Sequence, residues 1–269
     1  MKLAEQVSNY ATMDTSLREI ARKRAEEIIQ EKFRPGEISV VIAAAIHRVV
    51  TDNTGNADPY RAMKDIEIAE SSVLFDVVKD GYKDNFPDYL KLAALGNAVD
   101  FFRPIEDVKR EIMRNSLAFT IDDSALLEGK VKRAKNILYL ADNAGEVFFD
   151  LPLLMLMRRF SHVVYVVKES PTQNDITYEE VMRAGMQEKI GEVMTTGTAT
   201  AGIDFSVASA EFKMTFEEAD FIFAKGMGYY ETLEELPANG RIFFCLKAKC
   251  TPVANSLNVP LGSYVALMH

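Results

Sequence analysis

Residues that could hold a metal ion follow two apolar runs in the second half of the chain. Asp142 and Asn143 come directly after the run 137–141, and Asp175 follows the run 163–167 after a short polar segment. Carboxylate and amide oxygens are hard ligands, which Mg²⁺ and Mn²⁺ use together with waters and a substrate phosphate. These three side chains could supply part of such a shell.

Lysines and glycines follow three further runs. TTGTATAG occupies 195–202, Lys225-Gly226-Met227-Gly228 follows the run 221–224, and Lys247 and Lys249 come after the run 242–246. A lysine ammonium suits a phosphate oxygen, and glycines let backbone N–H groups approach an anion. Oxygen ligands and cations would therefore meet in one place if these runs are neighbouring strands.

Each of these residues also has a purely structural interpretation. Asp142 and Asp175 could cap the helices that follow them, and Gly226-Met227-Gly228 lacks the third glycine of a dinucleotide-binding loop. The three histidines, His47, His162 and His269, are scattered without metal-ligand spacing. Convergence of several polar groups on one sheet edge favours a site, because independent caps do not predict it.

The elements that must position these residues are short strands alternating with helices. β-rich runs at 137–141, 163–167, 192–195, 221–224 and 242–246 alternate with helical patterns at 147–159, 176–189, 211–219 and 229–236. Such alternation predicts βαβ units and a mostly parallel sheet, whose carboxyl ends carry the ligand site. The segment 261–267 is predicted as an additional edge strand.

The first half of the chain has helical patterns. Helices are predicted at 14–33, at 38–49, after an Asp58-Pro59 start, and at 87–101, 104–119 and 123–134. The predicted fold is thus α/β, with a helical N-terminal part, residues 1–130. A three-layer α/β/α part with a Rossmann-like sheet, residues 131–269, follows it.

Composition sets the class of protein. The chain has 269 residues, 48% of them apolar and 26% charged, and a net charge of -9. This charge argues against a broad nucleic-acid surface, and no apolar run approaches the roughly 18 residues of a membrane span. The N-terminus lacks the apolar core of a signal peptide, and Cys245 and Cys250 form no disulfide or zinc pattern. We expect a cytoplasmic protein without membrane or nucleic-acid partners.

Motifs in these same segments resemble those of the damage-control phosphatase family, which are metal-dependent enzymes. In order they are LADNAGEVFFDLPLL, KESPTQNDITYEEV, GTATAGIDFSVASAEF, ADFIFAKGMGYYETL and LKAKCTPVANSLNVPLG, with TGNADPYRAMK and LGNAVDF in the helical half. The resemblance spans about residues 50 to 269. It looks closest to the short archaeal and bacterial branch.

The resemblance implies a role for each matching position. A divalent metal (Mn, Mg, Co or Ni) would be held by Asp142, Asn143 and Asp175. Substrate phosphate would be bound by Lys225 and by the backbone of Gly226, Met227, Gly228 and Tyr230, with Glu231 nearby. Lys247 or Lys249 would provide a second cation. Asn97 and Asp100 would line the site from the helical part. Tyr229 stands where the family usually has Asn.

The predicted activity is metal-assisted hydrolysis of small phosphorylated metabolites such as sugar phosphates. The nucleophile is either a water on the metal, with Asp142 or Glu146 as proton acceptor, or Asp142 itself through a phosphoaspartyl intermediate. Two alternatives stay open: a carboxyl methyltransferase that uses S-adenosylmethionine, and a non-catalytic phosphometabolite-binding protein. The first would need a cofactor loop that the sequence lacks, and Tyr229 keeps the second open.

Overall fold

The computed structural model describes the chain apart from residues 1, 33, 35–38, 98–109 and 111–116. Its helices are α1 (Lys2–Ala11), α2 (Thr15–Lys32), α3 (Ser39–Thr54), α4 (Arg61–Val78), α5 (Phe86–Gly96), α7 (Ser124–Arg133), α8 (Val147–Met157), α9 (Tyr178–Arg183), α10 (Gln187–Ile190), α11 (Ala210–Glu218), α12 (Gly226–Leu233) and α13 (Thr251–Ser256), with 3₁₀ turns η1 (Lys79–Gly81) and η2 (Ala144–Glu146). Its strands are β1 (Phe119–Asp122), β2 (Asn136–Leu140), β3 (His162–Val167), β4 (Val193–Thr195), β5 (Phe221–Lys225), β6 (Ile242–Lys247) and β7 (Tyr264–Met268).

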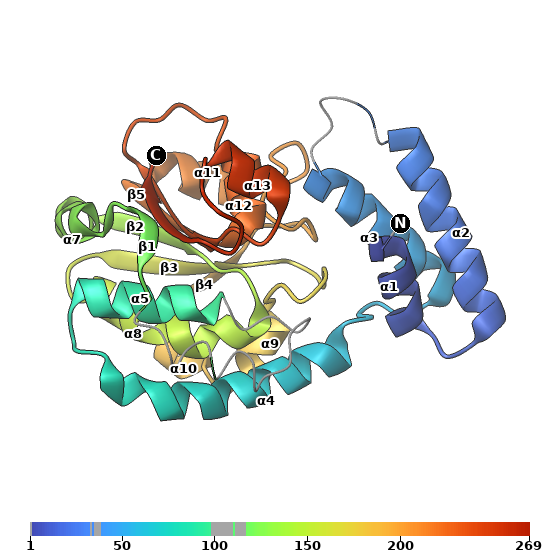
Figure 1. Cartoon of the computed structure of the whole chain (residues 1–269), viewed down its shortest axis with the longest axis horizontal. Helices are drawn as coiled ribbons and strands as arrows, with labels where there is room; N and C mark the ends of the chain where they lie inside the picture. The colour runs from blue at the N-terminus through green and yellow to red at the C-terminus, as the bar shows by residue number, and fades with distance from the viewer. Residues whose placement is uncertain (1, 33, 35–38, 98–109, 111–116) are drawn as a thin grey trace.

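The described strands form one sheet in the order β1-β7-β6-β5-β2-β3-β4, parallel except for the β6–β7 pair (Figure 1). Alternate residues of β2 face opposite layers. Ile137 and Tyr139 belong to a core shared with α5, α7 and α8, whereas Leu138 and Leu140 belong to one shared with α11, α12 and α13. The predicted three-layer α/β fold is confirmed.

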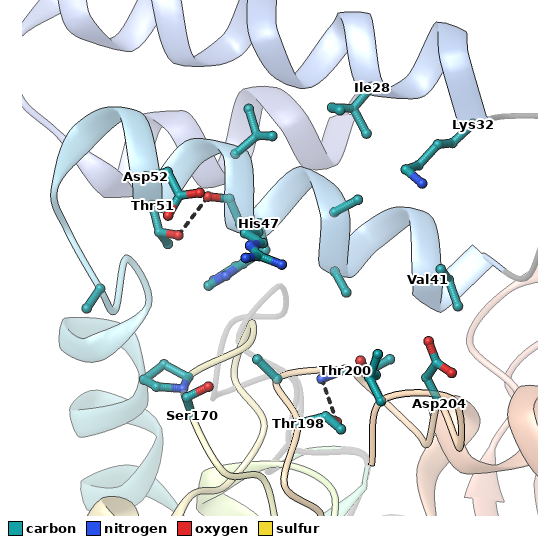
Figure 2. Close-up of a pocket in the computed structure, with 18 of the residues that line it drawn as sticks. Ile28, Lys32, Val41, His47, Thr51, Asp52, Ser170, Thr198, Thr200 and Asp204 are labelled. Carbon is teal, nitrogen blue, oxygen red and sulfur yellow. Dashed lines mark hydrogen bonds between the residues drawn. The ribbon is translucent and has the colours of Figure 1, made fainter. Parts of the chain in front are cut away.

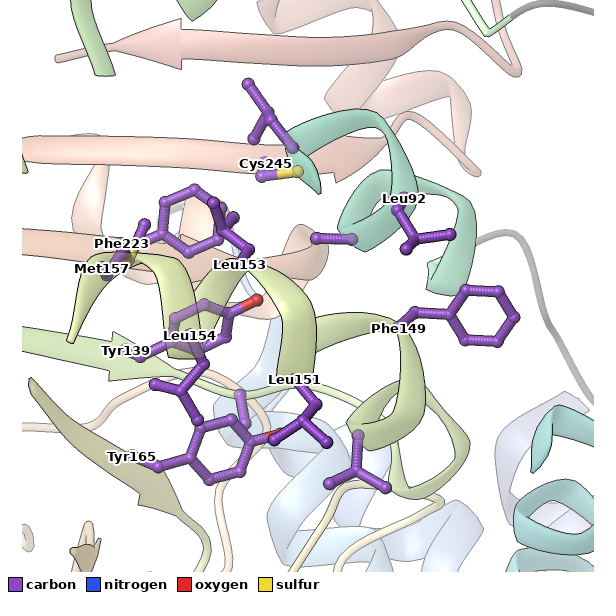
Figure 3. Packing of buried hydrophobic residues seen from close by; sticks show 14 of the residues in the cluster. Leu92, Tyr139, Phe149, Leu151, Leu153, Leu154, Met157, Tyr165, Phe223 and Cys245 are labelled. Atoms are coloured by element: carbon purple, nitrogen blue, oxygen red, sulfur yellow. The ribbon is translucent and has the colours of Figure 1, made fainter. Parts of the chain in front are cut away.

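Helix α8 follows the interior strand β2 and is buried on nearly every side. Apart from Asp150, its sequence, VFFDLPLLMLM, is apolar all round, which is typical of a helix enclosed by protein. Figure 3 shows its leucines over the aromatic rings of Tyr139, Tyr165 and Phe223. This packing fixes the turn between β2 and α8.

The strand ends are aligned where the candidate residues emerge. Leu140 of β2 pairs with Val166 of β3 on one side and with Ala224 of β5 on the other. Side chains that follow these three positions therefore leave the sheet at one edge. The register brings the Asp142 turn, the β3 loop and Lys225 together.

Several predicted elements differ from the structure. The segment predicted as an edge strand forms β7, which lies between β1 and β6. The helix predicted at 176–189 is two helices separated at Gly185, which has a φ of +67°. Asp58 does not cap α4; it pairs with Lys64 at 2.8 Å instead. The predicted helix at 104–119 falls mostly outside the described residues, and its last residue, Phe119, begins β1.

The first three helices pack around a core of their own, which includes Val7, Ile42, Ile46 and Val50. They lie to one side of the sheet in Figure 1, and α4 runs from them beneath the α/β layers. The division into residues 1–130 and 131–269 stays a prediction; β1 lies before residue 131 and α7 extends across it, yet both belong with the sheet. No helix in the described part of the chain is long and apolar enough to cross a membrane.

Candidate active site

A cavity of about 400 Å³ lies at the carboxyl ends of the central strands. The predicted site residues that line it are Asn97, Asp142, Asn143, Asp175, Met227, Gly228, Glu231 and Lys249. Its other lining residues were not among the individually predicted site residues; they are Leu3, Ser39, Val40, Ala43, Gln173, Asn174 and Ala201, the last of which lies in the TTGTATAG segment. Helices α1 and α3 therefore form the wall opposite the sheet.

Backbone contacts join the two segments that carry the carboxylates. The N–H of Ile176 donates to the carbonyl of Asp142 at 2.8 Å, and that of Ala144 donates to Asn174 at 2.9 Å. An isolated bridge also pairs Asn143 with Asp175. Asp175 is not a helix cap, because Thr177 caps α9 in a capping box. Asp142 does not cap η2 either. The residue before η2 is Asn143, and its side chain makes no capping hydrogen bond.

Two asparagines fix the carboxylate of Asp142. Asn143 Nδ2 donates to Asp142 Oδ2 at 3.2 Å and to Glu146 Oε1 at 2.7 Å. Asn97 Nδ2 donates to the same two oxygens at 2.8 and 2.7 Å. The backbone N–H of Lys247 in turn donates to Asn97 Oδ1 at 3.0 Å. Asn97 therefore acts from the position after α5, which ends at Gly96.

A glycine allows α12 to approach this carboxylate. Gly226 has a φ of +79°, and a Cβ built on it would lie 1.9 Å from Asp142 Oδ2. Any larger residue would therefore collide with the carboxylate as well as strain the backbone. The glycine that follows β5 is required by this contact.

The ammonium group of Lys225 lies beneath the cavity and is fully buried. Its Nζ donates to Glu146 Oε2 and Asp150 Oδ1, both at 2.6 Å, and to the carbonyl of Ala93 at 2.8 Å. Burial opposes the charge of Lys225, but the carboxylates of Asp150 and Glu146 raise its pKa above the ordinary value. Lys225 and Glu146 are absent from the cavity wall.

The surroundings of the two cavity carboxylates oppose their negative charge. Burial raises the pKa of Asp142 well above its usual range, and the charges of Glu146 and Asp175 add to this effect. Burial also raises the pKa of Asp175 to about 6, although Lys168 opposes the shift. Asp175 Oδ2 has no hydrogen-bond partner among the described residues, and Lys168 Nζ lies 3.6 Å from it.

These features fit a divalent cation. Two buried carboxylates and an amide side chain offer hard oxygen donors, and a cation would relieve their repulsion. In the described part of the chain, no cluster of three or more His, Cys, Asp or Glu side chains could hold a metal. A cation at Asp142 and Asp175 would thus depend also on Asn143 and on water, as is usual for Mg²⁺.

Comparison with known proteins decides the family. The model of the damage-control phosphatase ARMT1-like domain matches residues 1–265. The chain belongs to the damage-control phosphatase family. It is 38% identical to a damage-control phosphatase of Pyrococcus horikoshii over 98% of this chain and 93% of that protein. It is 31% identical to one of Archaeoglobus fulgidus over 89% and 86% of the two chains.

The fold agrees with that assignment. The crystal structure of a DUF89 family protein from Pyrococcus horikoshii matches with a TM-score of 0.90 and 36% identity, over 99% of this chain and 95% of that one. The predicted resemblance is therefore confirmed. The protein is a phosphatase, and divalent-metal dependence is general in the damage-control phosphatase family.

In this damage-control phosphatase, Tyr229 contacts a lysine that was not among the predicted site residues. Lys168 directly follows β3 and is fully buried. Its Nζ donates to Tyr229 Oη at 2.9 Å and to the carbonyl of Gly202 at 2.8 Å, and it lies 4.0 Å from the Tyr229 ring centre. Burial lowers the pKa of Lys168, while Asp175 and Asp142 oppose the shift. A lysine at the end of an apolar strand was the signal available.

The remaining predicted residues of this phosphatase are divided between the cavity and its surroundings. Lys249 lines the cavity, whereas Lys247 Nζ lies 3.4 Å from Tyr264 Oη and outside the lining. Tyr230 Oη lies 3.0 Å from Ser256 Oγ, which directs it away from the cavity. Glu231 accepts a hydrogen bond from Ser39 of α3. Asp100 lies outside the described residues.

Proposed function

We propose that this phosphatase hydrolyses small phosphorylated metabolites with a divalent cation held by Asp142, Asn143 and Asp175. The observation that carries the proposal is a pair of buried carboxylates on one cavity, of which Asp175 has an oxygen with no hydrogen-bond partner among the described residues. When bound there, a divalent cation withdraws negative charge from a phosphate ester. Sugar phosphates are the substrates that we would test first.

The first turn of α12 and Lys249 are the groups we assign to the phosphate. Met227 and Gly228 line the cavity, and the N–H groups in the first turn of a helix have no intrahelical acceptors. Such a turn favours an anion. Lys249 lies close enough to Asp142 that its charge lowers the pKa of that carboxyl against the larger effect of burial. A phosphate bound here would lie beside Asp142, which Gly226 of the same turn approaches closely.

We assign Lys225 and Glu146 to positioning rather than to substrate contact. Both oxygens of Glu146 are engaged, one by Asn97 and Asn143 and the other by Lys225. Glu146 therefore holds the amides that orient Asp142. Of the two predicted proton acceptors, Asp142 is the one on the cavity wall.

Chelation and reconstitution test the proposal. A panel of sugar phosphates would be assayed for released phosphate with Mn²⁺, Mg²⁺, Co²⁺ or Ni²⁺, before and after treatment with a chelator. We expect chelation to abolish turnover and each metal-ligand variant, Asp142→Asn and Asp175→Asn, to lose both Mn²⁺ binding and activity. Asp76→Asn, at a surface aspartate paired with Lys79, serves as the control. Full turnover by the metal-free protein would contradict the proposal.

Family membership favours hydrolysis over the methyltransferase and the non-catalytic alternatives. The structure also offers a role for Tyr229 that does not require loss of catalysis, since its hydroxyl holds Lys168 near Asp175.

A further inference from the structure

A second and larger cavity, of about 1070 Å³, lies beside the candidate active site (Figure 2). Helix α3 forms one wall, and the loops after β3 and β4 form the other. The two cavities lie side by side along the same three segments, which are α3, the loop after β3 and the loop after β4. Residues 40 and 43 of α3 line the first, and residues 41, 44 and 45 line the second. The β3 loop contributes 173–175 to the first cavity and 170–171 to the second.

A buried histidine on this wall has a nitrogen with no hydrogen-bond partner among the described residues. His47 is 5% exposed, and its Nε2 has no hydrogen-bond partner within the described residues. Its ring stacks on Tyr60 with 6.0 Å between ring centres. Figure 2 shows His47 on the side of α3 that faces the two loops. A buried nitrogen without a partner is costly, so His47 is the residue of this wall whose hydrogen bonding is incomplete.

The imidazole is neutral near pH 7. Burial and the nearby charge of Lys64 lower the pKa of His47 to about 4. A neutral imidazole has one nitrogen that donates and one that accepts, so it suits a hydroxyl better than an anionic group.

The opposite wall also offers hydroxyl groups. Thr198 and Thr200 are buried, and both line the cavity together with Ser170. The loop is held in place, because Gly197 has a φ of +74° and approaches Ser209 too closely for a side chain. The charged lining residues balance, with two cations, Lys32 and Arg48, and two anions, Asp52 and Asp204. The cavity as a whole favours no net charge.

We propose that this cavity is a second subsite, which binds an uncharged, hydroxyl-rich group at the far end of the phosphomonoester. The inference rests on the proposed function, because the phosphate would occupy the first cavity. One helical turn, about 6 Å, separates Ala43 on the first cavity from His47 on the second. The substrate class is therefore a phosphomonoester with an organic part larger than one sugar ring, of which a disaccharide monophosphate is the simplest probe.

Two matched substrates test the subsite. Trehalose 6-phosphate contains glucose 6-phosphate plus one further uncharged sugar. We expect the wild-type, metal-loaded protein to hydrolyse it with a kcat/KM at least about tenfold higher, since a site that hydrogen-bonds hydroxyl groups discriminates against substrates that lack them. His47→Phe and Thr200→Val should each reduce that ratio about fivefold, the effect of one hydrogen bond. Thr215→Val, on the outer helix α11, should leave the ratio and the activity unchanged.

Binding of unphosphorylated trehalose separates this inference from the proposed function. Calorimetry should detect trehalose binding to the wild-type protein and its loss in His47→Phe, with Thr200→Val as the second variant if His47→Phe does not fold. Equal kcat/KM for the two phosphates, or no trehalose binding, would overturn the subsite. Trehalose binding without metal-dependent hydrolysis of either phosphate would contradict the proposed function instead.

Discussion

Gly226 determines how closely α12 can approach the carboxylate of Asp142. Replacement by alanine would place a methyl group 1.9 Å from Asp142 Oδ2. The carboxylate would have to move away from the hydrogen bonds of Asn97 and Asn143. We predict that Gly226→Ala lowers kcat by about 100-fold, the scale expected for a misplacement of about 1 Å. Steady-state kinetics with saturating metal would measure the loss.

A second glycine separates collision from backbone strain. Gly185 has a φ of +67°, but a Cβ built there meets no atom within 4 Å. Gly185→Ala should therefore lose about 1 kcal/mol of stability from the left-handed conformation and retain its kinetics. A similar loss of kcat in both variants would show that strain, not contact with Asp142, limits position 226.

Lys225 tests the difference between a positioning residue and a phosphate-binding one. Lys225→Met would leave Glu146 and Asp150 as neighbouring buried carboxylates without their cation. Loss of one partner from a buried ion pair costs about 3–5 kcal/mol. We predict a fall of that size in the free energy of unfolding, together with a lower kcat. Lys132→Met, which breaks an exposed pair with Glu128, should change stability by less than about 1 kcal/mol. A raised KM with wild-type stability would instead support direct binding of phosphate by Lys225.

His47 should make stability depend on pH. Its pKa falls from the ordinary 6.5 to about 4 in the folded protein, through burial and Lys64. Below pH 6.5 the unfolded chain therefore takes up a proton that the folded protein refuses, so stability decreases as the pH falls from 6.5 to 4. The contribution lost is about 3 kcal/mol.

The effect can be isolated by comparison with His47→Phe. The free energy of unfolding of the wild type minus that of the variant should decrease as the pH falls across this range. Denaturant unfolding would measure both values. The exposed His162 provides the control substitution, His162→Phe. A difference that stays constant with pH would show that His47 is protonated equally in both states.

At the scale of elements, the interior strands were predictable because their sequences are continuous apolar runs. The four runs at 137–141, 163–167, 221–224 and 242–246 correspond to β2, β3, β5 and β6 within one or two residues. These strands are buried on both faces, so no polar alternation interrupts them. β7 was found as a strand but placed at the wrong position, since neighbours in a sheet are decided by tertiary packing.

The shorter elements carry weaker signals. β1 has four residues with alternating burial, and α13 has six. Segments of this length hold too few periodic positions to be distinguished from loops. α9 and α10 were predicted as one helix because Gly185 sits within a helical pattern, and the positive φ of a glycine cannot be known before the fold.

The positions of the candidate site residues were predictable where they depend on chain order, and unpredictable where they depend on how deeply a side chain is buried. The parallel register brings Asp142, Asn143 and Asp175 to one cavity, as the strand ends predicted. Lys225 and Lys249 both follow strands, yet only Lys249 lines that cavity. Residue type alone cannot show that Lys225 is the lysine beneath the Asp142 turn. Its position depends on ion pairs with Glu146 and Asp150, which form only in the folded chain.

At the scale of the whole molecule, the first three helices complete the cavity although their own core is small. That core is rich in alanine, including Ala4, Ala11, Ala21 and Ala25, and so buries little apolar area per residue. Ser39 of α3 contacts Glu231 of α12 across the cavity. A unit with few apolar contacts opens at low free energy, so α1–α3 should be less protected than the sheet.

Ligands that occupy the cavity should therefore stabilise α3 against local opening. Opening of α3 would remove Ser39, Val40 and Ala43 from the cavity wall. A ligand that requires this wall, present at about 100 times its Kd, lowers the population of the open state, and so slows hydrogen exchange, by up to about 100-fold. Hydrogen exchange of Ser39–Thr54 would be measured with and without Mn²⁺ plus inorganic phosphate. Ser124–Arg133, which forms α7 and packs in the core shared with α5 and α8, is the internal control. Protection that increases around Asp142 and Asp175 but not in α3 would show that the helical unit forms no part of the binding site.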